Sequence, residues 1–205
     1  AIAYVLYKPL FECDESKINE IISVLGYLYR KIGSFILLAG LLLSAFLPWI
    51  FSNTEIPLSV IYTGFYCYLV SSMFGYFISY KITILSADQR NYIVTGFFQL
   101  ITTIKVILQM TLARNFYLYF AVELISGLLL SLLLNHKVYR CYPWLQTDVR
   151  TGRELYKEYP EIGKYIKQLF FHKIGGFVQG QVLPILIYAF VSLPMVALYT
   201  NYTLI

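Results

Sequence analysis

The sequence predicts an all-α protein that crosses a membrane several times. Hydrophobic residues make up 59% of the 205 residues and charged residues only 13%, whereas soluble domains average about 25% charged residues. The apolar residues are gathered into long runs, several of them near the length of about 20 residues with which a helix crosses a bilayer core. The basic residues lie almost entirely between those runs. This combination is not that of a water-soluble domain.

The first part of the chain is expected to contain the end of one helix and then an interfacial helix. Residues 1–7 are apolar and are followed by Pro9, so we expect a helix to end there. Residues 14–31 carry apolar side chains at helical spacing after a candidate N-cap at Asp14 or Ser16. This pattern is typical of an amphipathic helix lying at a membrane surface. A solvated connector helix is the alternative interpretation.

Two spans are expected next, over residues 32–51 and 57–80, with a short turn between them. Trp49 suits the headgroup belt at the end of the first span. The second span is rich in Tyr, Ser and Gly, and such residues allow membrane helices to approach closely or to line a polar lumen.

The following two apolar runs predict a transmembrane hairpin. They cover residues 91–113 and 116–135 and are joined only by Arg114 and Asn115. So short a link makes the two helices antiparallel neighbours. Asp88, shortly before the first run, is expected to cap that helix or to interact favourably with its dipole.

The rest of the chain predicts a linker and the start of a second membrane region. Residues 136–173 contain no run able to span and are expected to be cytoplasmic. Residues 174–205 are apolar but interrupted by Gly and Pro, which a membrane helix tolerates only where protein or water satisfies the freed backbone groups. Both ends of the chain fall inside apolar runs and no signal peptide is visible, so we expect a fragment of a longer membrane protein.

The basic segments predict the orientation. Lys and Arg concentrate in residues 8–31, 81–90 and 137–173, which alternate with short turns at residues 52–57 and 114–115. By the positive-inside rule the basic segments are cytoplasmic. Because the net charge of +5 is divided among these membrane-flanking segments, it does not predict binding to nucleic acid.

Lys105 is the strongest candidate for a functional residue, because ionisable groups inside spans are functional by default. Glu123 lies at a similar depth on the neighbouring run, so the two side chains are expected to pair. Thr102 and Gln109 share a helical face with Lys105, and Gln99 lies further inward. We expect this face to line a cationic cavity for an anionic substrate. The alternative is a structural ion pair that sets the register of the helices.

No motif predicts catalysis or a metal site. The sequence has no HExxH pattern and no Gly-rich phosphate loop, and His136 and His172 each stand beside a lysine at the edge of an apolar run. Cys13, Cys67 and Cys141 are widely spaced and are expected to be free thiols. We therefore expect neither an enzyme nor a bound cofactor.

Seven short stretches, in consistent order over essentially the whole chain, resemble bacterial polysaccharide flippases. These are the O-antigen and capsule repeat-unit transporters of the multidrug/oligosaccharidyl-lipid/polysaccharide exporter superfamily. The stretches are YKPLFECDESKINEI, LYRKIG, SADQRNYI, IKVILQ, HKVYRCYPWL, FFHKIGG and ALYTNYTLI.

The resemblance implies a two-lobed fold of twelve or more helices in the bacterial inner membrane. Such a protein flips an undecaprenyl-pyrophosphate-linked oligosaccharide, as in lipopolysaccharide and capsule synthesis, beside a polysaccharide polymerase and glycosyltransferases. It further implies that residues 1–135 run from the end of the second helix to the sixth. Residues 136–173 would be the inter-lobe linker, and residues 174–205 the seventh helix and the beginning of the eighth.

One departure from the family pattern stands in the expected seventh helix. Many members carry a polar Ser/Thr-Asp-Asn-like stretch there, whereas this chain has QGQVLPIL, with Gln179 and Gln181 as the only polar substitutes. Three other functions remain as alternatives. They are a drug or cation exporter of the same superfamily, a membrane-embedded glycan polymerase or glycosyltransferase, and a purely structural membrane scaffold.

Overall fold

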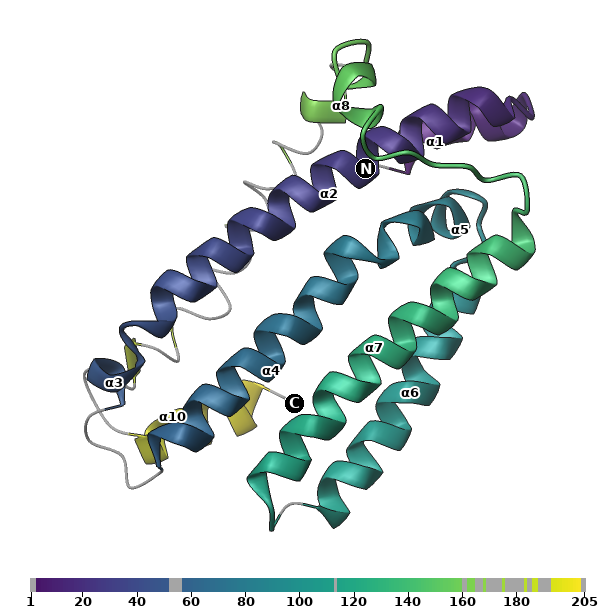
Figure 1. Ribbon diagram of the computed structural model, residues 1–205. Helices are drawn as coiled ribbons and strands as arrows, with labels where there is room; N and C mark the ends of the chain where they lie inside the picture. The colour runs from purple at the N-terminus through teal and green to yellow at the C-terminus, as the bar shows by residue number, and fades with distance from the viewer. Residues whose placement is uncertain are drawn as a thin grey trace. The chain divides into compact units, whose positions relative to one another are not determined.

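The computed structural model describes residues 3–51, 57–112, 114–159, 162–164, 168, 175, 183, 186–187 and 193–203. The chain divides into two compact units, Ile2–Tyr159 and Pro160–Ile205. Throughout the described ranges the regular structure is helical, without strands. The larger unit contains α1 (Tyr4–Phe11), α2 (Glu15–Ser44), α3 (Leu47–Ile50), α4 (Leu58–Phe77), η1 (Ser79–Ile82), α5 (Thr83–Ala87), α6 (Asn91–Thr111), α7 (Phe116–Cys141) and α8 (Gly152–Leu155) (Figure 1).

Four of these helices, α2, α4, α6 and α7, are long and apolar enough to cross a membrane. They lie side by side in the order α2, α4, α7, α6, with α4 packed against α2 on one side and α7 on the other (Figure 1). Their outer faces expose large apolar side chains, such as Phe35 and Leu42 on α2 and Ile107 and Met110 on α6. Apolar faces of this extent are those of an α-helical membrane protein rather than a water-facing bundle.

Helix α2 is one continuous helix, so the separate interfacial helix expected over residues 14–31 was wrong as an element. Its N-cap is Asp14, as the sequence predicts, with Oδ1 accepting a hydrogen bond from the Lys17 N–H at 3.1 Å. That backbone bond, followed by the bond from the Lys17 side chain, lowers the pKa of the Asp14 carboxyl. Arg30 and Lys31 separate a mixed polar and apolar stretch from the apolar run that follows. Charged side chains do not interrupt the backbone hydrogen bonds of a helix, so α2 continues through both residues.

Close approach of α2 and α4 depends on Gly33. A Cβ atom at that position would lie 2.9 Å from the Cβ of Tyr76 on α4. Real Cβ contacts are essentially never that short, so a larger residue would push the two helices apart. Tyr29, one turn earlier on α2, also contacts Tyr76, with ring centroids 6.2 Å apart.

Helix α7 extends to Cys141, so the boundary expected after Asn135 falls inside a helix. The apolar run stops at Asn135, but a helix ends where its hydrogen bonds end. Here the last turn closes with the Tyr142 N–H donating to the Val138 carbonyl at 2.8 Å. Pro143 then prevents continuation.

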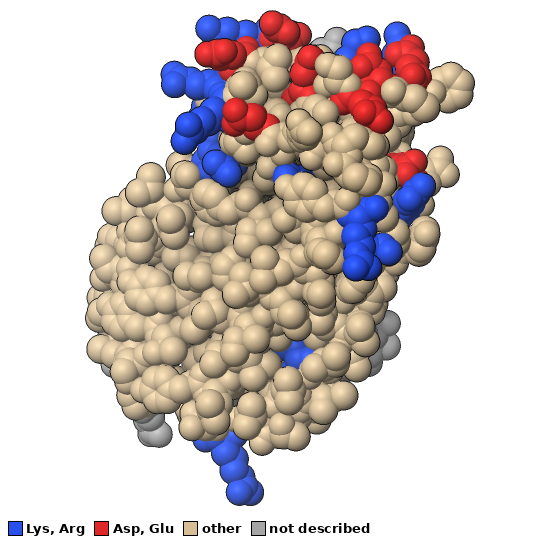
Figure 2. All heavy atoms as spheres, turned by 45° about the vertical axis from the view of Figure 1, so that its right-hand side comes forward, with Lys and Arg blue, Asp and Glu red and all other residues tan. Residues whose placement is uncertain are grey.

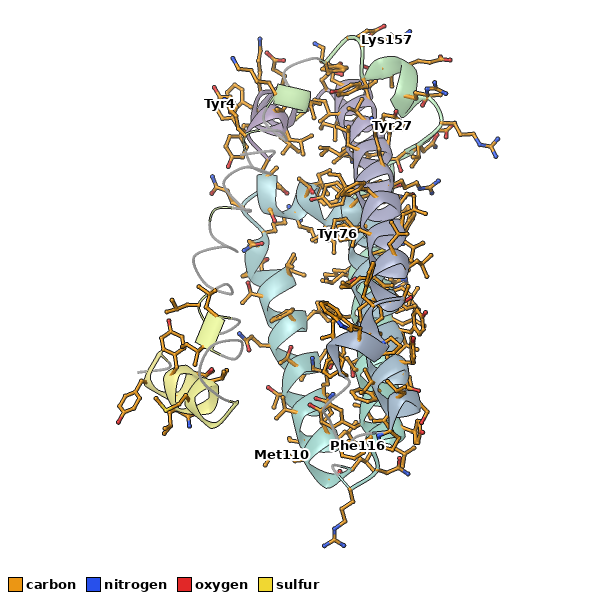
Figure 3. The ribbon with its side chains drawn as sticks, turned by 90° about the vertical axis from the view of Figure 1, so that its left-hand side faces the viewer. Tyr4, Tyr27, Tyr76, Met110, Phe116 and Lys157 are labelled. Atoms are coloured by element: carbon orange, nitrogen blue, oxygen red, sulfur yellow. The ribbon has the colours of Figure 1, made fainter. Side chains whose placement is uncertain are left out.

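Residues 142–159, which we call the strap, return from α7 and pack on the first half of α2. Tyr27 of α2 and Tyr156 and Lys157 of the strap belong to this region (Figure 3). A Cβ atom at Gly152 would collide with the backbone carbonyl of Ser23, so only glycine fits this contact. Three hydrogen bonds also join the strap to α2: Gln146 N to Asn19 Oδ1 at 3.0 Å, Asp148 N to Ser23 Oγ at 3.1 Å, and Tyr159 OH to Glu20 Oε2 at 2.7 Å.

The Tyr159 hydroxyl at the end of the strap is half-buried and donates to a carboxylate, that of Glu20. Burial, and then the hydrogen bond to Glu20, raise the pKa of Tyr159 to about 12.

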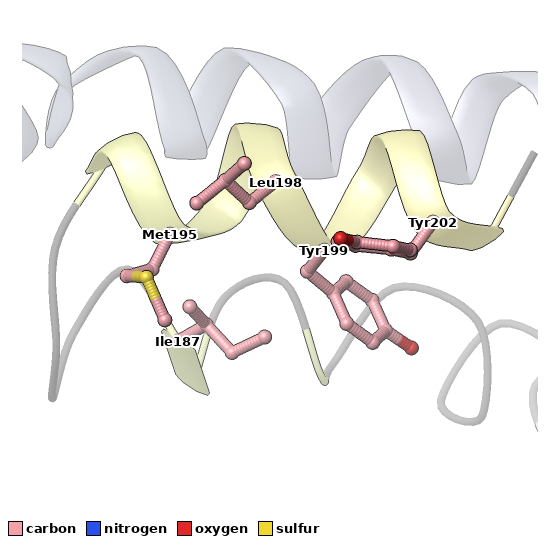
Figure 4. Close-up of a pocket in the computed structure, with 5 residues that line it drawn as sticks. All are labelled: Ile187, Met195, Leu198, Tyr199 and Tyr202. Carbon is pink, nitrogen blue, oxygen red and sulfur yellow. The ribbon is translucent and has the colours of Figure 1, made fainter.

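The smaller unit contributes α10 (Leu193–Thr203) to the described part of the chain. An apolar pocket in this unit is lined by Ile187, Met195, Leu198, Tyr199 and Tyr202 (Figure 4). The expectations for an interrupted seventh helix, including Gln179 and Gln181, lie outside the described residues.

Candidate functional site

Helices α6 and α7 form an antiparallel hairpin whose turn is held by Asn115. This residue caps α7, and its Oδ1 accepts hydrogen bonds from the Tyr117 N–H at 3.1 Å and the Leu118 N–H at 3.3 Å. Met110 near the end of α6 and Phe116 at the start of α7 mark the hairpin end of the unit (Figure 3). Because the turn is short and capped, residues at equal distance from it face each other across the pair.

The hairpin brings together Lys105, Gln109 and Glu123, which we call the charged trio. The Lys105 Nζ lies 3.2 Å from the Glu123 Oε1 and donates to it. The Gln109 Nε2 donates to the other carboxylate oxygen, Oε2, at 3.1 Å, and lies 3.4 Å from the Tyr119 carbonyl oxygen. Both oxygens of the carboxylate are therefore engaged within the hairpin.

The three members of the trio differ in exposure. Gln109 is buried, at 6% exposed, whereas the side chains of Glu123 and Lys105 are 14% and 24% exposed. A lysine ammonium carries three donors, and one of those of Lys105 goes to Glu123. The trio thus presents a satisfied, well-covered carboxylate and a more accessible ammonium with donors to spare.

Aromatic side chains stand beside the trio, on α4 and α7. The ring of Phe120 makes edge contacts with Tyr68 at 6.1 Å and with Tyr119 at 5.7 Å between centroids. Tyr68 belongs to α4, so its contact with Phe120 places α4 against α7 within one helical turn of Glu123. Tyrosine rings of this kind offer an apolar face and a hydroxyl to a ligand.

The other two predicted site residues stay outside the trio. Thr102 is one turn from Lys105 and half-buried, and Gln99 is exposed. Among the hydrogen bonds found between described residues, none involves either side chain. Gln99 lies about 15 Å along α6 from Gln109, at 1.5 Å per residue, so the helix cannot bring it to the same group.

A second polar network joins α5 to the end of α7 and corrects the role expected for Asp88. The Asp88 carboxylate does not cap α6. Instead its Oδ2 accepts a hydrogen bond from the Tyr142 hydroxyl at 2.6 Å and pairs with the Arg90 Nε at 2.8 Å. Burial and the bond to Asp88 raise the pKa of Tyr142. Between Asp88 and the start of α6 the chain passes through Gln89, whose φ of 57° lies in the left-handed region.

Charged side chains gather at the end of the molecule opposite the hairpin turn, over α1, the start of α2 and the strap (Figure 2). Ion pairs there join Lys8 to Glu12 and Lys17 to Asp14. We call this the charged end. It differs from the trio in being open to solvent, so its ion pairs contribute little to stability.

Metal chemistry finds no support in the described residues, where no group of three or more His, Cys, Asp or Glu side chains could hold an ion. The three cysteines are free and separate.

No family model, curated protein or solved structure matches the chain. Fold and site together define the class as an α-helical membrane protein with an ion pair between two of its candidate spans.

Proposed function

We propose that the chain is part of a transporter that flips a lipid-linked oligosaccharide across the bacterial inner membrane. One observation carries the proposal: the spans contain an ammonium, on Lys105, that is the most exposed member of the charged trio and donates only to Glu123 among the described residues. A cation at this depth costs about 2.5–3.5 kcal/mol on insertion scales, so it is retained for a reason. The resemblance of seven sequence stretches to polysaccharide flippases supplies the substrate class.

The state of the carboxylate favours an anionic substrate over a cationic one. Glu123 has both oxygens occupied, by Lys105 and Gln109, and a cationic drug would have to displace these donors. A pyrophosphate needs only to approach the free side of Lys105. In this pathway the Glu123 carboxylate keeps its bond from Gln109 while Lys105 turns to the phosphate, and the pair is the resting state of the site.

The neighbouring groups suit the rest of such a substrate. Tyr68 and Tyr119 present hydroxyls and ring faces to sugars. The exposed apolar faces of α6 and α7 allow a polyprenyl tail to remain in the bilayer while the head crosses. A polysaccharide polymerase and glycosyltransferases are the proposed partners, because they consume and supply a lipid-linked repeat unit.

The test is glycan export by the full-length protein in cells. Lys105→Ala is expected to abolish surface glycan at near-normal membrane levels, and Lys105→Arg to retain part of it because charge matters more than shape here. Arg114→Ala, which removes an exposed cation from the same hairpin, is the matched control and is expected to export normally. Export by a Lys105→Met/Glu123→Gln double variant would reduce Lys105 to a structural residue and refute the proposal.

A further inference from the structure

A buried lysine stands where η1 packs against α7, far from the charged trio. Lys81 is only 7% exposed. Its Nζ donates to the Tyr139 hydroxyl and lies 4.3 Å from the centroid of the Tyr139 ring and 5.7 Å from that of Tyr80. The ammonium is thus enclosed by two aromatic rings, which attract cations through their negative faces.

No acidic side chain balances this charge in the described part of the chain. The four ion pairs found there do not include Lys81. Burying a cation is costly unless it is paired and hydrogen-bonded, and one phenol and two ring faces leave part of the three-donor ammonium unsatisfied. A structural lysine normally finds a carboxylate, so this environment fits an anion that comes from outside the unit.

A second unsatisfied group lies one helical turn away. The Asn135 Oδ1 is buried without a hydrogen-bond partner. Asn135 lies four residues before Tyr139 on α7, on the same helical face, and the Tyr139 hydroxyl accepts from Lys81. One further turn back, Ser131 accepts a hydrogen bond from the Ser79 hydroxyl of η1 at 3.1 Å. Ser131, Asn135 and Tyr139 therefore form a polar stripe along α7 that faces η1.

The Tyr139 end of the stripe lies beside basic side chains near the end of α7, where we expect the headgroup region of a bilayer. Tyr139 stands on α7 between Lys137 and Arg140, two residues before the helix ends at Cys141. Along α7 it is about 24 Å from Glu123, at 1.5 Å per residue, so this is not part of the trio. Tyr139 itself is 42% exposed, which makes it the outer cover of the enclosed ammonium.

We propose that Lys81, Asn135 and Tyr139 form a binding site for the phosphate group of a membrane lipid. The phosphate oxygens accept hydrogen bonds from the Lys81 ammonium and, after rotation of its amide by half a turn, from the Asn135 NH₂. The Tyr139 ring swings outward to admit the phosphate, and its hydroxyl remains available as a third donor. The proposal stands without the transport function, because an ordinary anionic phospholipid and a polyprenyl pyrophosphate offer the same group.

The first test is lipid retention by the purified full chain in detergent, measured by native mass spectrometry. The probes are phosphatidylglycerol, undecaprenyl pyrophosphate and diacylglycerol, which lacks phosphate. Lys81→Gln is expected to weaken binding of a phosphate-bearing lipid about tenfold, whereas Arg140→Gln, which removes an exposed cation at the same depth, changes it less than about twofold. Preference for one phosphate lipid identifies the source, and retention of diacylglycerol as strong as that of both would overturn the proposal.

The second test uses the unaltered chain and therefore does not depend on the folding of a variant. Lys81 is labelled with an amine-reactive reagent and quantified by peptide mass spectrometry, with Lys137 as the internal control. Phosphate-bearing lipid is expected to protect Lys81 and diacylglycerol to leave it unprotected, while Tyr139→Ala increases labelling of Lys81 in the absence of lipid. Equal labelling with and without phosphate lipid would refute the site, whatever the outcome for export.

Discussion

Removing the charge of Lys105 or of Glu123 alone is expected to lower the free energy of unfolding more than removing both charges together. Lys105→Met leaves the Glu123 carboxylate, 14% exposed, with Gln109 as its remaining donor. Removing one partner of a buried ion pair costs about 3–5 kcal/mol, and the bond from Gln109 offsets about 1 kcal/mol. We therefore expect a loss of about 2.5 kcal/mol in the free energy of unfolding.

The reverse change is expected to be milder, because the stranded group is more exposed. Glu123→Gln leaves an ammonium that is 24% exposed and still has an amide oxygen in reach. The expected loss is about 1.5 kcal/mol. The double variant removes both charges and keeps similar shapes, so it should lie within about 1 kcal/mol of the wild type. The coupling energy between the two sites is then about 3–4 kcal/mol.

The measurement is a double-mutant cycle on the purified protein, unfolded by SDS in mixed micelles and followed by helical circular dichroism. The ranking is as informative as the size: Lys105→Met should be the least stable variant and the double variant the most stable of the three. A coupling below about 0.5 kcal/mol would show that the side chains act independently. A larger loss for Glu123→Gln than for Lys105→Met would refute the argument from exposure.

Three further predictions concern the strap and the orientation. Gly152→Ala should lower the free energy with which the strap packs on α2 by about 1–3 kcal/mol and speed proteolysis of the strap. Gly96→Ala, where a Cβ atom meets nothing within 4 Å, should change neither. Because the folded pKa of Tyr159 is raised to about 12 from 10.0, its contribution to stability is complete below pH 10 and lost as pH rises toward 12; a wild-type minus Tyr159→Phe absorbance difference at 295 nm with a midpoint near 10 would contradict this. In a cysteine-free background, an impermeant thiol reagent added to intact cells should label Arg114→Cys but not Glu158→Cys, and the reverse pattern would invert the orientation.

The elements that could be predicted from sequence are those with a local signal. Apolar runs of span length become α4, α6 and α7, and the short link at Asn115 imposes the hairpin. Once the hairpin is given, counting residues from the turn is enough to bring Lys105 to the depth of Glu123. The acceptor at Asp14, three residues before the Lys17 N–H that it caps, is local in the same sense.

The features that could not be predicted depend on partners distant in the chain. The position of Asp88 just before α6 predicts a cap, and no neighbouring residue in the sequence predicts that it accepts a hydrogen bond from the Tyr142 hydroxyl instead. The sequence predicts for Lys81 only an exposed basic residue at the end of a span. Its burial could not be predicted because Tyr139, which covers it, belongs to another helix. The hydrogen bond from the Asp148 N–H of the strap to the Ser23 Oγ joins residues more than a hundred positions apart.

The length of α2 gives it a mechanical role. Its 30 residues make a rod of about 45 Å, whereas the hydrocarbon core of a bilayer is about 30 Å thick. The rod must therefore tilt or project. Eight of its ten buried residues, from Ile18 to Leu28, lie in the half that carries the strap, and Gly33 and Ser44 lie beyond it. A thicker or thinner membrane changes the tilt that best matches the apolar half. A rod that changes its tilt carries along whatever packs on it, so we expect a change of bilayer thickness to displace the strap.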